Sequence, residues 1–245
     1  MSVLKQVKEE VNNFQAGMLL TYSNFSVPQD KFLNLAKSLS VLSKKGIIKR
    51  ISKGVYYKPE YFPFGASLPT DSEILETVLS KNKAKIAYIT GINAYNQLGL
   101  TTQVSKEIVI STDKLRRKIK MQNTEIRFVK SKFTENIEKT LDIPILQILD
   151  AMTDIKDIPD SDINTSCKIL LQKLKFLDKS QRERLTQLVL HYPPVTRALT
   201  GAFFEILGED KTLLELIQNS LNKLTNFKLG ISTNILPNKF NWKIR

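Results

Sequence analysis

The segment from residue 29 to residue 57 constrains the fold of this chain more than any other. Pro28 precedes a run of 29–45 with helical periodicity, and Gly46 suits the left-handed position that ends a helix. Its apolar residues are Phe32, Leu35, Leu39 and Leu42. Two β-prone runs follow, at 47–51 and 55–57, with Lys53-Gly54 between them. A helix followed by a basic hairpin predicts a winged helix-turn-helix, which places one helix in the DNA major groove.

The residues before this segment supply the other parts of such a domain. Residues 3–14 have the apolar spacing of an amphipathic helix, and residues 18–20 form a short strand that we expect to pair with the hairpin. Thr21 is expected to cap a short helix that runs to Phe25. The aromatic and Pro-containing stretch at 61–65 marks a boundary. We therefore expect a winged helix-turn-helix domain at 1–64 and a larger domain at 65–245.

The larger domain divides into two parts by its pattern. Residues 66–135 predict a small α/β unit with helices at 72–80 and 92–98 and strands at 86–89, 106–111 and 124–130. Residues 141–224 are mainly helical, with helices expected at 145–153, 161–177, 180–191, 195–207 and 211–224. A short tail with β-prone pieces follows from 227. The expected fold class is α+β, with an N-terminal winged helix-turn-helix and a mixed α/β and helical domain after it.

Charge indicates the kind of partner. The formal net charge is +13, of which +6 lies in residues 1–64, +5 in 65–140 and +2 in 141–245. This distribution favours a polyanionic partner, and it places the positive field on the first 140 residues. The single cysteine, Cys167, and the charges at Lys5, Lys8 and Glu9 that interrupt any signal peptide lead us to expect a cytoplasmic protein with no membrane partner.

Two groups of residues are candidates for contact with DNA. Opposite the apolar face of the first predicted helix lie Asn34, Lys37, Ser38, Val41, Lys44 and Lys45. Asn and Ser can bond base edges, and Lys can reach phosphate or guanine. The expected hairpin adds Lys49, Arg50, Lys53 and Gly54, the last of which would let the backbone approach the phosphates. The alternatives are a solvated helix face and a charged edge strand that prevents sheet-to-sheet pairing.

A third basic group lies in the second domain. Lys114, Arg116, Arg117, Lys118 and Lys120 place five cations in seven residues. They form a strong local field that could extend a DNA footprint. A solvated loop and a contact with an acidic protein partner are equally compatible with the pattern.

The sequence has few signals of catalysis. The only histidine, His191, stands at an expected helix end, and Cys167 lies among apolar residues of a predicted helix. The carboxylates between Asp150 and Asp162 fit helix ends and caps better than a metal site. No phosphate-binding glycine loop, paired-cysteine zinc pattern or nucleophile elbow occurs. We therefore expect no enzyme activity, no catalytic residues, no metal site and no cofactor.

Three stretches resemble a known family. They are GMLLTYSNF with LSVLSKKGIIKRISKGVYYKP in the first domain, YITGINAYNQLGLTTQV from Tyr88 to Val104, and HYPPVTRALTGAFFEILG from His191 to Gly208. Together they resemble the AbiEi-type antitoxins and transcriptional regulators of bacterial type IV toxin–antitoxin, or abortive-infection, systems. The second stretch is the more specific match, because it is similar to the start of that family's second domain.

The resemblance implies a DNA-binding repressor that binds double-stranded operator DNA and represses its own operon. It also implies that the domain beyond the winged helix counteracts a nucleotidyltransferase-like toxin encoded in the same operon. The family's DNA-contacting positions fall here on the helix ending at Lys45 and on Lys49, Arg50 and Lys53. Related helices often carry Arg where this chain has Val41, so guanine readout is not implied at that position, whereas phosphate contacts are unaffected.

Two other functions stay open on the sequence. The first is a winged-helix transcriptional regulator whose C-terminal domain senses a small effector and which has no toxin partner. The second is an enzyme, such as a nuclease or nucleotidyltransferase, that uses the winged helix only to dock on DNA. The low content of His and Cys argues against the enzyme.

Overall fold

The protein has a mixed α and β structure, as expected from its sequence pattern. The computed structural model describes residues 2–63, 65–66, 73, 76–77, 86–115, 117–120, 124–133 and 139–245. The chain divides into two units: unit 1 holds Met1–Lys83 with Lys118–Ile126, and unit 2 holds Ala84–Arg117 with Arg127–Arg245. This division falls at 83–84, whereas the aromatic stretch in the sequence places a boundary at 64–65.

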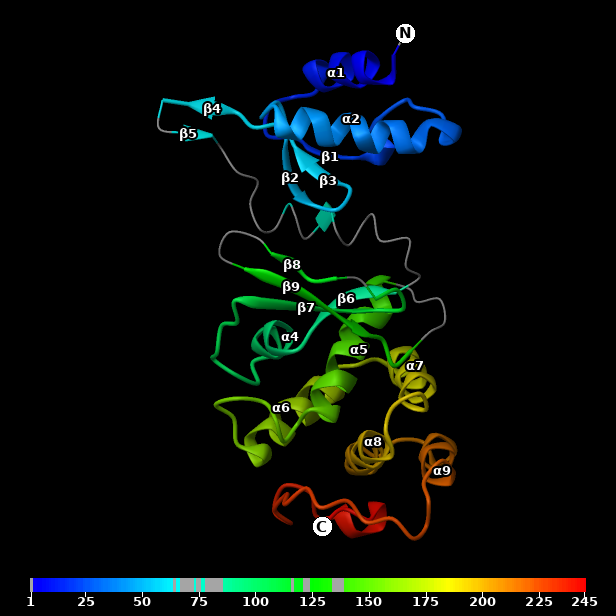
Figure 1. Cartoon of the computed structure of the whole chain (residues 1–245). Coiled ribbons are helices and arrows are strands. Elements are labelled where there is room, and N and C mark those ends of the chain that lie inside the picture. Colours follow the sequence, from blue (N-terminus) through cyan, green and yellow to red (C-terminus); the bar gives the residue numbers. More distant parts are fainter. Residues whose placement is uncertain are drawn as a thin grey trace. The chain divides into compact units, whose positions relative to one another are not determined.

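Unit 1 begins with a helix, a strand, a second helical segment and a hairpin (Figure 1). Its elements are helix α1 (Val3–Asn13), strand β1 (Leu19–Thr21), 3-10 helices η1 (Tyr22–Asn24) and η2 (Gln29–Lys31), helix α2 (Phe32–Lys44), and strands β2 (Lys49–Ser52) and β3 (Val55–Tyr57). The three strands form an antiparallel sheet in the order β1-β3-β2. The expected pairing of the first strand with the hairpin is confirmed.

The core of unit 1 lies between α1, α2 and the sheet. Leu35, Leu39 and Leu42 of α2 are buried together with residues of the other elements, including Val7, Val11, Leu20 and Ile48. The expectation that Phe32 also faces the core is wrong, because this side chain is 45% exposed; its ring lies 4.8 Å, centroid to centroid, from that of Tyr22. The single helix expected over 29–45 starts as a 3-10 turn, and only from Phe32 is it α-helical.

Two features of unit 1 follow from residues after the hairpin. The ammonium group of Lys58 donates to the carbonyl oxygens of Asn12 and Phe14, both at 2.8 Å, and so binds the carbonyl end of α1. Strands β4 (Tyr61–Phe62) and β5 (Gly65–Ala66) form a small antiparallel hairpin at the stretch that the sequence marked only as a boundary. The Tyr61 hydroxyl donates to the carbonyl of Gly46 at 3.2 Å, which ties this hairpin to the end of α2.

The four-stranded sheet is antiparallel where its pairings are described. Its strands are β6 (Ala87–Thr90), β7 (Glu107–Thr112), β8 (Ile119–Lys120) and β9 (Glu125–Lys130), in the order β6-β7-β9-β8, and helix α4 (Ile92–Gln97) follows β6. The expected strands at 86–89, 106–111 and 124–130 and the helix at 92–98 are confirmed within a residue or two. Strand β8 was not expected, and the helix expected at 72–80 lies mostly outside the described residues.

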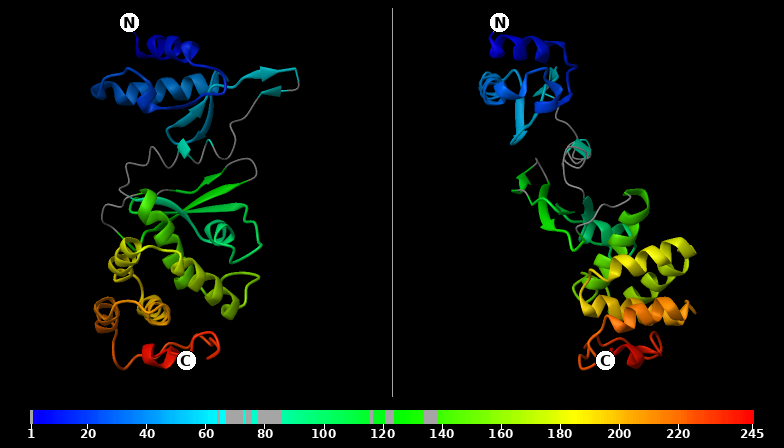
Figure 2. Two further views of the ribbon diagram at one scale, coloured as in Figure 1. Left: turned by 180° about the vertical axis from the view of Figure 1, so that it is seen from behind. Right: turned by 90° about the vertical axis from the view of Figure 1, so that its right-hand side faces the viewer.

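The rest of unit 2 is helical. Its helices are α5 (Lys139–Thr153), α6 (Ile163–Lys175), α7 (Lys179–Val189), α8 (Pro194–Ile206) and α9 (Lys211–Asn219), with a 3-10 turn η3 (Lys239–Trp242) near the C-terminus. Figure 2 shows α5 to α8 gathered on one side of the sheet. Their inward faces form one apolar core with residues of β6 and α4. The five helices expected after residue 141 are present, although α5 begins at Lys139 and not at 145, and α9 ends at Asn219 and not at 224.

Aspartates begin three of these helices, as the sequence led us to expect for Asp162. Its carboxylate accepts from the backbone N–H of Thr165 at 2.9 Å, and Asp178 and Asp210 bind the first turns of α7 and α9 in the same way. The hydrogen bonds from Thr165 hold the pKa of Asp162 below its usual range. Within the described residues, every helix is too short or too polar to traverse a lipid bilayer.

Candidate nucleic-acid interface

One face of α2 is open to solvent. Leu33, Lys37, Val41 and Lys44 follow one another at spacings of four, four and three, which places them in one row along a helix. All four are exposed, and Leu33 is 74% exposed although it is apolar. Leu35, Leu39 and Leu42 occupy the opposite, buried side. The helix therefore presents a row of mixed apolar and cationic character.

Most of the α2 residues predicted to contact DNA are available for it. Asn34, Lys37, Val41, Lys44 and Lys45 are exposed. Ser38 is a correction: it is only 5% exposed, and its hydroxyl donates to the carbonyl of Asn34 at 2.8 Å. Its position three residues after Leu35 and four before Leu42 turns it toward the core, so it cannot reach a base. Leu33 takes its place on the exposed face, where its apolar character gave no signal of function in the sequence.

The β2–β3 hairpin extends the cationic surface. Lys49, Arg50 and Lys53 are exposed, and β2 is an edge strand of its sheet. Pairing shifts between Arg50 and Ser52, so that one extra residue forms a bulge, and the Arg50 Nε donates to the Ser52 carbonyl at 3.2 Å. Such a bulge twists an edge strand and redirects its side chains.

Gly54 is a second correction. It is buried rather than open to a phosphate, because the ring of Tyr22 covers it. A Cβ at this position would lie 2.7 Å from Tyr22 Cε2, and the φ angle is +80°. Glycine is therefore required here by the turn and by packing against η1.

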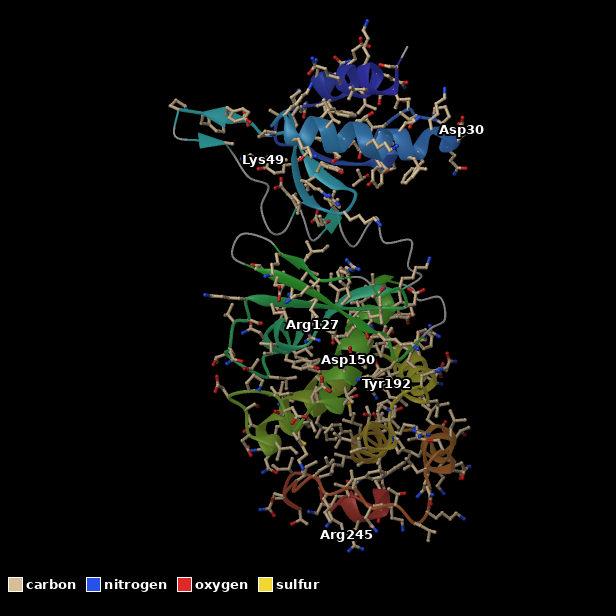
Figure 3. The ribbon with its side chains drawn as sticks, in the orientation of Figure 1. Asp30, Lys49, Arg127, Asp150, Tyr192 and Arg245 are labelled. Atoms are coloured by element: carbon tan, nitrogen blue, oxygen red, sulfur yellow. The ribbon has the colours of Figure 1, made fainter. Side chains whose placement is uncertain are left out.

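The segment of sequence that forms α2 and the β2–β3 hairpin contains no Asp or Glu. Between Asp30 and Glu60 the chain has eight Lys and Arg residues and no Asp or Glu. Of these cations, Lys58 binds the end of α1, and none of the eight takes part in an ion pair within the described residues. Figure 3 labels Lys49 on β2 and Asp30 at the start of this segment. The helix and the hairpin thus form a continuous acid-free stretch of chain.

The basic group at 114–120 is not one uniform loop. Lys114, Arg117, Lys118 and Lys120 are exposed, and Arg116 lies outside the described residues. Ile119 and Lys120 form β8, and the Lys118 ammonium pairs with Glu125 at 3.0 Å. Arg117 and Lys120 are exposed and form no ion pair among the described residues of this group.

Unit 2 contains a buried carboxylate whose role the sequence did not reveal. Asp150 on α5 is 5% exposed and accepts four hydrogen bonds. The donors are the hydroxyls of Thr90 at 2.6 Å, Tyr88 at 3.0 Å and Tyr192 at 3.0 Å, and the Lys132 ammonium at 3.5 Å. Burial raises the pKa of Asp150, although Lys132 and the hydroxyls act in the opposite direction.

A signal for this cluster was present in the sequence. Asp150 stands four residues after Leu146 and one after Leu149, on the apolar side of the expected helix, which is a buried position for a charged residue. The sequence-based assignment of Asp150 to a helix end or cap is therefore wrong. Its partners come from β6, from residue 132 and from residue 192, so only the fold brings them together.

A cavity of about 280 Å³ opens beside this cluster. It is lined by Thr90, Gly91, Val109, Ser111, Arg127, Val129, Lys130, Lys132, Asp150 and Asp154. A second cavity of about 180 Å³ shares Gly91, Val109, Arg127 and Asp154 with it. Its other lining residues are Ile92, Tyr95, Ser105, Glu107, Asp157 and Pro159. The two are lobes of one groove, which we call the Arg127 groove; Figure 3 labels Arg127 and Asp150.

The two residues considered as catalytic candidates in the sequence, Cys167 and His191, pack against other side chains. Cys167 is buried, and burial raises the pKa of its thiol to about 12, which keeps it protonated at neutral pH. The rings of His191 and Phe133 pack edge to face with a centroid separation of 4.9 Å. In the part of the chain that the structure describes, no group of three or more His, Cys, Asp and Glu side chains is placed to hold a metal ion.

Comparisons with known proteins assign the chain to a family. The chain is similar over 90% of its length to 82% of a protein of known structure, described as the crystal structure of Rv2827c protein from Mycobacterium tuberculosis, with 12% identity and a TM-score of 0.48. A search of the curated proteins found no match. The model of a family described as "Family of unknown function (DUF6088)" matches residues 6–185, which is more than half of the chain. The protein therefore belongs to the DUF6088 family.

Proposed function

We propose that this protein is a DNA-binding transcriptional repressor and that the first elements of unit 1 form a winged helix-turn-helix. The order of elements supports this assignment. Helix α1, strand β1, the short helix η1, helix α2 and the β2–β3 hairpin follow one another as the parts of a winged helix do. In this assignment α2 is the recognition helix and the β2–β3 hairpin is the wing.

The observation that carries the proposal is the acid-free cationic surface of α2 and the hairpin. Lys37, Lys44 and Lys45 on the helix and Lys49, Arg50 and Lys53 on the hairpin are exposed and free of ion pairs among the described residues. Cations that neutralise phosphates release counterions, and this release supplies most of the affinity for DNA. Asn34 and Leu33 add a group that can bond adenine and an apolar group that can contact a thymine methyl.

The proposed regulation is that of an AbiEi-type antitoxin. By the resemblance of its sequence to that family, the protein represses its own operon, and unit 2 counteracts a nucleotidyltransferase-like toxin from the same operon. The proposed action on DNA is non-catalytic: the protein occupies the operator. The proposed location is the cytoplasm, where an operator and such a toxin would both be present.

The decisive experiment measures affinity for DNA from upstream of the protein's own gene as a function of salt. The triple variant Lys49→Ala, Arg50→Ala, Lys53→Ala should bind any duplex more weakly. Three lost phosphate contacts should reduce the slope of log K against log salt by about 2 to 3.

A matched control replaces three exposed lysines of unit 2, Lys168, Lys173 and Lys223, by Ala. This variant removes the same charge as the hairpin variant, and we expect its salt slope to stay close to that of the wild type. Equal slopes for the hairpin variant and the wild type would refute the assignment of the hairpin as a wing.

One observation favours a second function. The Arg127 groove in unit 2 is a place where a small effector could bind, as a ligand-sensing regulator would require. Co-expression separates the two functions. An antitoxin restores the growth of cells that express the toxin from its operon, whereas an effector-sensing regulator leaves their growth inhibited.

A further inference from the structure

The Arg127 groove differs in charge between its two lobes. The larger lobe is lined by the cations Arg127, Lys130 and Lys132 together with Asp150 and Asp154. Asp150 already accepts from three hydroxyls and from Lys132. Lys130, by contrast, is exposed and takes part in no ion pair among the described residues. The larger lobe therefore has in Lys130 a positive charge that forms no ion pair among the described residues, and Thr90 and Ser111 also line it.

The smaller lobe has the opposite character. Three carboxylates, those of Glu107, Asp154 and Asp157, line it with Arg127 as the one cation among its lining residues. Glu107 accepts from the Arg127 Nε at 2.9 Å, and Asp154 accepts from the Tyr95 hydroxyl at 2.6 Å. Asp157 is exposed and forms no described ion pair. One guanidinium cannot neutralise three carboxylates, so this lobe favours a further positive charge.

Arg127 and Asp154 line both lobes and lie between the cationic lobe and the acidic lobe. The Arg127 guanidinium is held by Glu107 through Nε, which leaves its terminal nitrogens available to a ligand in the larger lobe. Asp154 follows directly after α5, which ends at Thr153, and the Tyr95 hydroxyl on α4 fixes its carboxylate. The groove is thus a dipolar site that is preformed by β7, β9 and the end of α5.

We propose that the Arg127 groove binds a small zwitterion, an amino-acid-like metabolite with an acid group at one end and a protonated amine at the other. The acid group lies in the larger lobe, near Arg127, Lys130 and Lys132. The amine lies in the smaller lobe, near Asp154, Asp157 and Glu107. The volumes of the two lobes suit a molecule of this size. The proposal does not rest on DNA binding, because every residue that carries it lies in unit 2.

A metal ion is a weaker candidate for the acidic lobe. The carboxylates that line it are not placed to hold a metal together, as judged over the described residues. An arginine in the wall opposes a bare cation, but it does not prevent an amine from donating hydrogen bonds to Asp154 and Asp157.

The test measures binding of four small probes to the full-length protein by titration calorimetry. L-lysine and 4-aminobutyrate carry both a carboxylate and an amine, hexanoate lacks any amine, and cadaverine lacks the carboxylate. We expect L-lysine or 4-aminobutyrate to bind at least tenfold more tightly than hexanoate and cadaverine. Equal binding of either truncated probe, or no binding of any of the four at millimolar concentration, would overturn the proposal.

Variants locate the site. Asp154→Asn keeps an acceptor for Tyr95 but removes the charge, and Lys130→Ala changes an exposed residue, so both should fold as the wild type does. Each should weaken binding of the preferred probe at least tenfold, whereas Lys211→Ala, an exposed lysine on α9, should leave it unchanged. Circular dichroism confirms folding of each variant. Wild-type affinity in both groove variants would place the ligand elsewhere and refute the assignment.

Discussion

At the scale of single residues, Asp150 shows how a charge is accommodated in the core of unit 2. Its carboxylate can accept from Thr90, Tyr88, Tyr192 and Lys132 at once, because an ionised carboxylate has only acceptor sites. In Asp150→Asn an amide NH₂ replaces one carboxylate oxygen. Because NH₂ is a donor and not an acceptor, the donors that faced this oxygen would lose their hydrogen bonds. We expect this variant to lose about 1 to 3 kcal/mol of unfolding free energy, the usual effect of leaving a buried donor unsatisfied. Urea denaturation at neutral pH measures this loss.

The pH dependence of that loss tests the ionisation of Asp150. Burial raises the pKa of Asp150 in the folded state, whereas in the unfolded chain its pKa has the ordinary value near 4. As the pH rises above about 4, the unfolded chain therefore releases the proton before the folded protein does. The wild type therefore loses stability as pH rises through the window above about 4, by at most about 1.4 kcal/mol per pH unit from this group. Asp150→Asn has no such proton, so its deficit in unfolding free energy should shrink as the pH rises above about 4. A deficit that grows with pH would show that the folded-state pKa is not raised.

Gly201 is constrained by a different contact. It lies in the interior of α8, and a Cβ there would collide with the ring of Trp242 in η3. The indole Nε1 donates to Glu205 on the same helix at 2.7 Å, so the ring cannot move away without losing that bond. We expect Gly201→Ala to reduce the unfolding free energy by about 1 to 3 kcal/mol.

A double-mutant cycle provides the control for Gly201. In a Trp242→Leu background the colliding ring is absent, and alanine is favoured over glycine in a helix by about 1 kcal/mol. Gly201→Ala should therefore stabilise that background, as measured by thermal or urea unfolding. A similar loss in both backgrounds would mean that the ring of Trp242 does not determine the need for glycine.

At the scale of elements, local pattern accounts for most of what could be predicted. The helices α5 to α9 and the buried face of α2 follow from apolar spacing and caps, and these were found from the sequence. Ser38 was misplaced because its side chain is polar, although its spacing of three residues from Leu35 and four from Leu42 places it on the buried face. Strands β4, β5 and β8 are two residues long, too short for any periodicity to appear.

The two candidate sites differ in how far the sequence can reveal them. The cationic surface of α2 and β2–β3 comes from one continuous segment, so its charge can be read directly from the sequence. The Arg127 groove combines residues between Thr90 and Pro159 through the pairing of β6 with β7 and the packing of α5 on β6. No local pattern predicts such a combination of residues. Its one signal in the sequence is Asp150, a charged residue on the apolar side of a predicted helix.

The row on α2 allows phosphate contact and base contact to be separated. Lys37→Ala should weaken binding to every sequence and reduce the salt slope by about 1, because it removes one phosphate contact. Leu33→Ala should leave the salt slope unchanged but reduce discrimination between operator and random DNA, because it removes an apolar contact. Fluorescence anisotropy over a salt series measures both quantities. The assignment of this row as a reading face fails if Leu33→Ala leaves discrimination intact.

At the scale of the whole molecule, positive charge is present on both units. Unit 1 has the acid-free segment 31–59, and unit 2 contributes Lys114 and Arg117 from the basic group at 114–120. Either unit could therefore meet a polyanion.

The double variant Lys114→Ala, Arg117→Ala tests whether unit 2 adds to the DNA footprint. On a duplex just long enough for the proposed recognition helix and wing, we expect its affinity to equal that of the wild type. On a long duplex, the loss of two phosphate contacts should reduce the salt slope by about 2. The variant Lys168→Ala, Lys173→Ala removes the same charge from α6 and is the control for a general field effect. If the double variant binds the long duplex with the wild-type slope, these two cations serve an acidic protein partner or solvent instead of DNA, and the footprint is confined to unit 1.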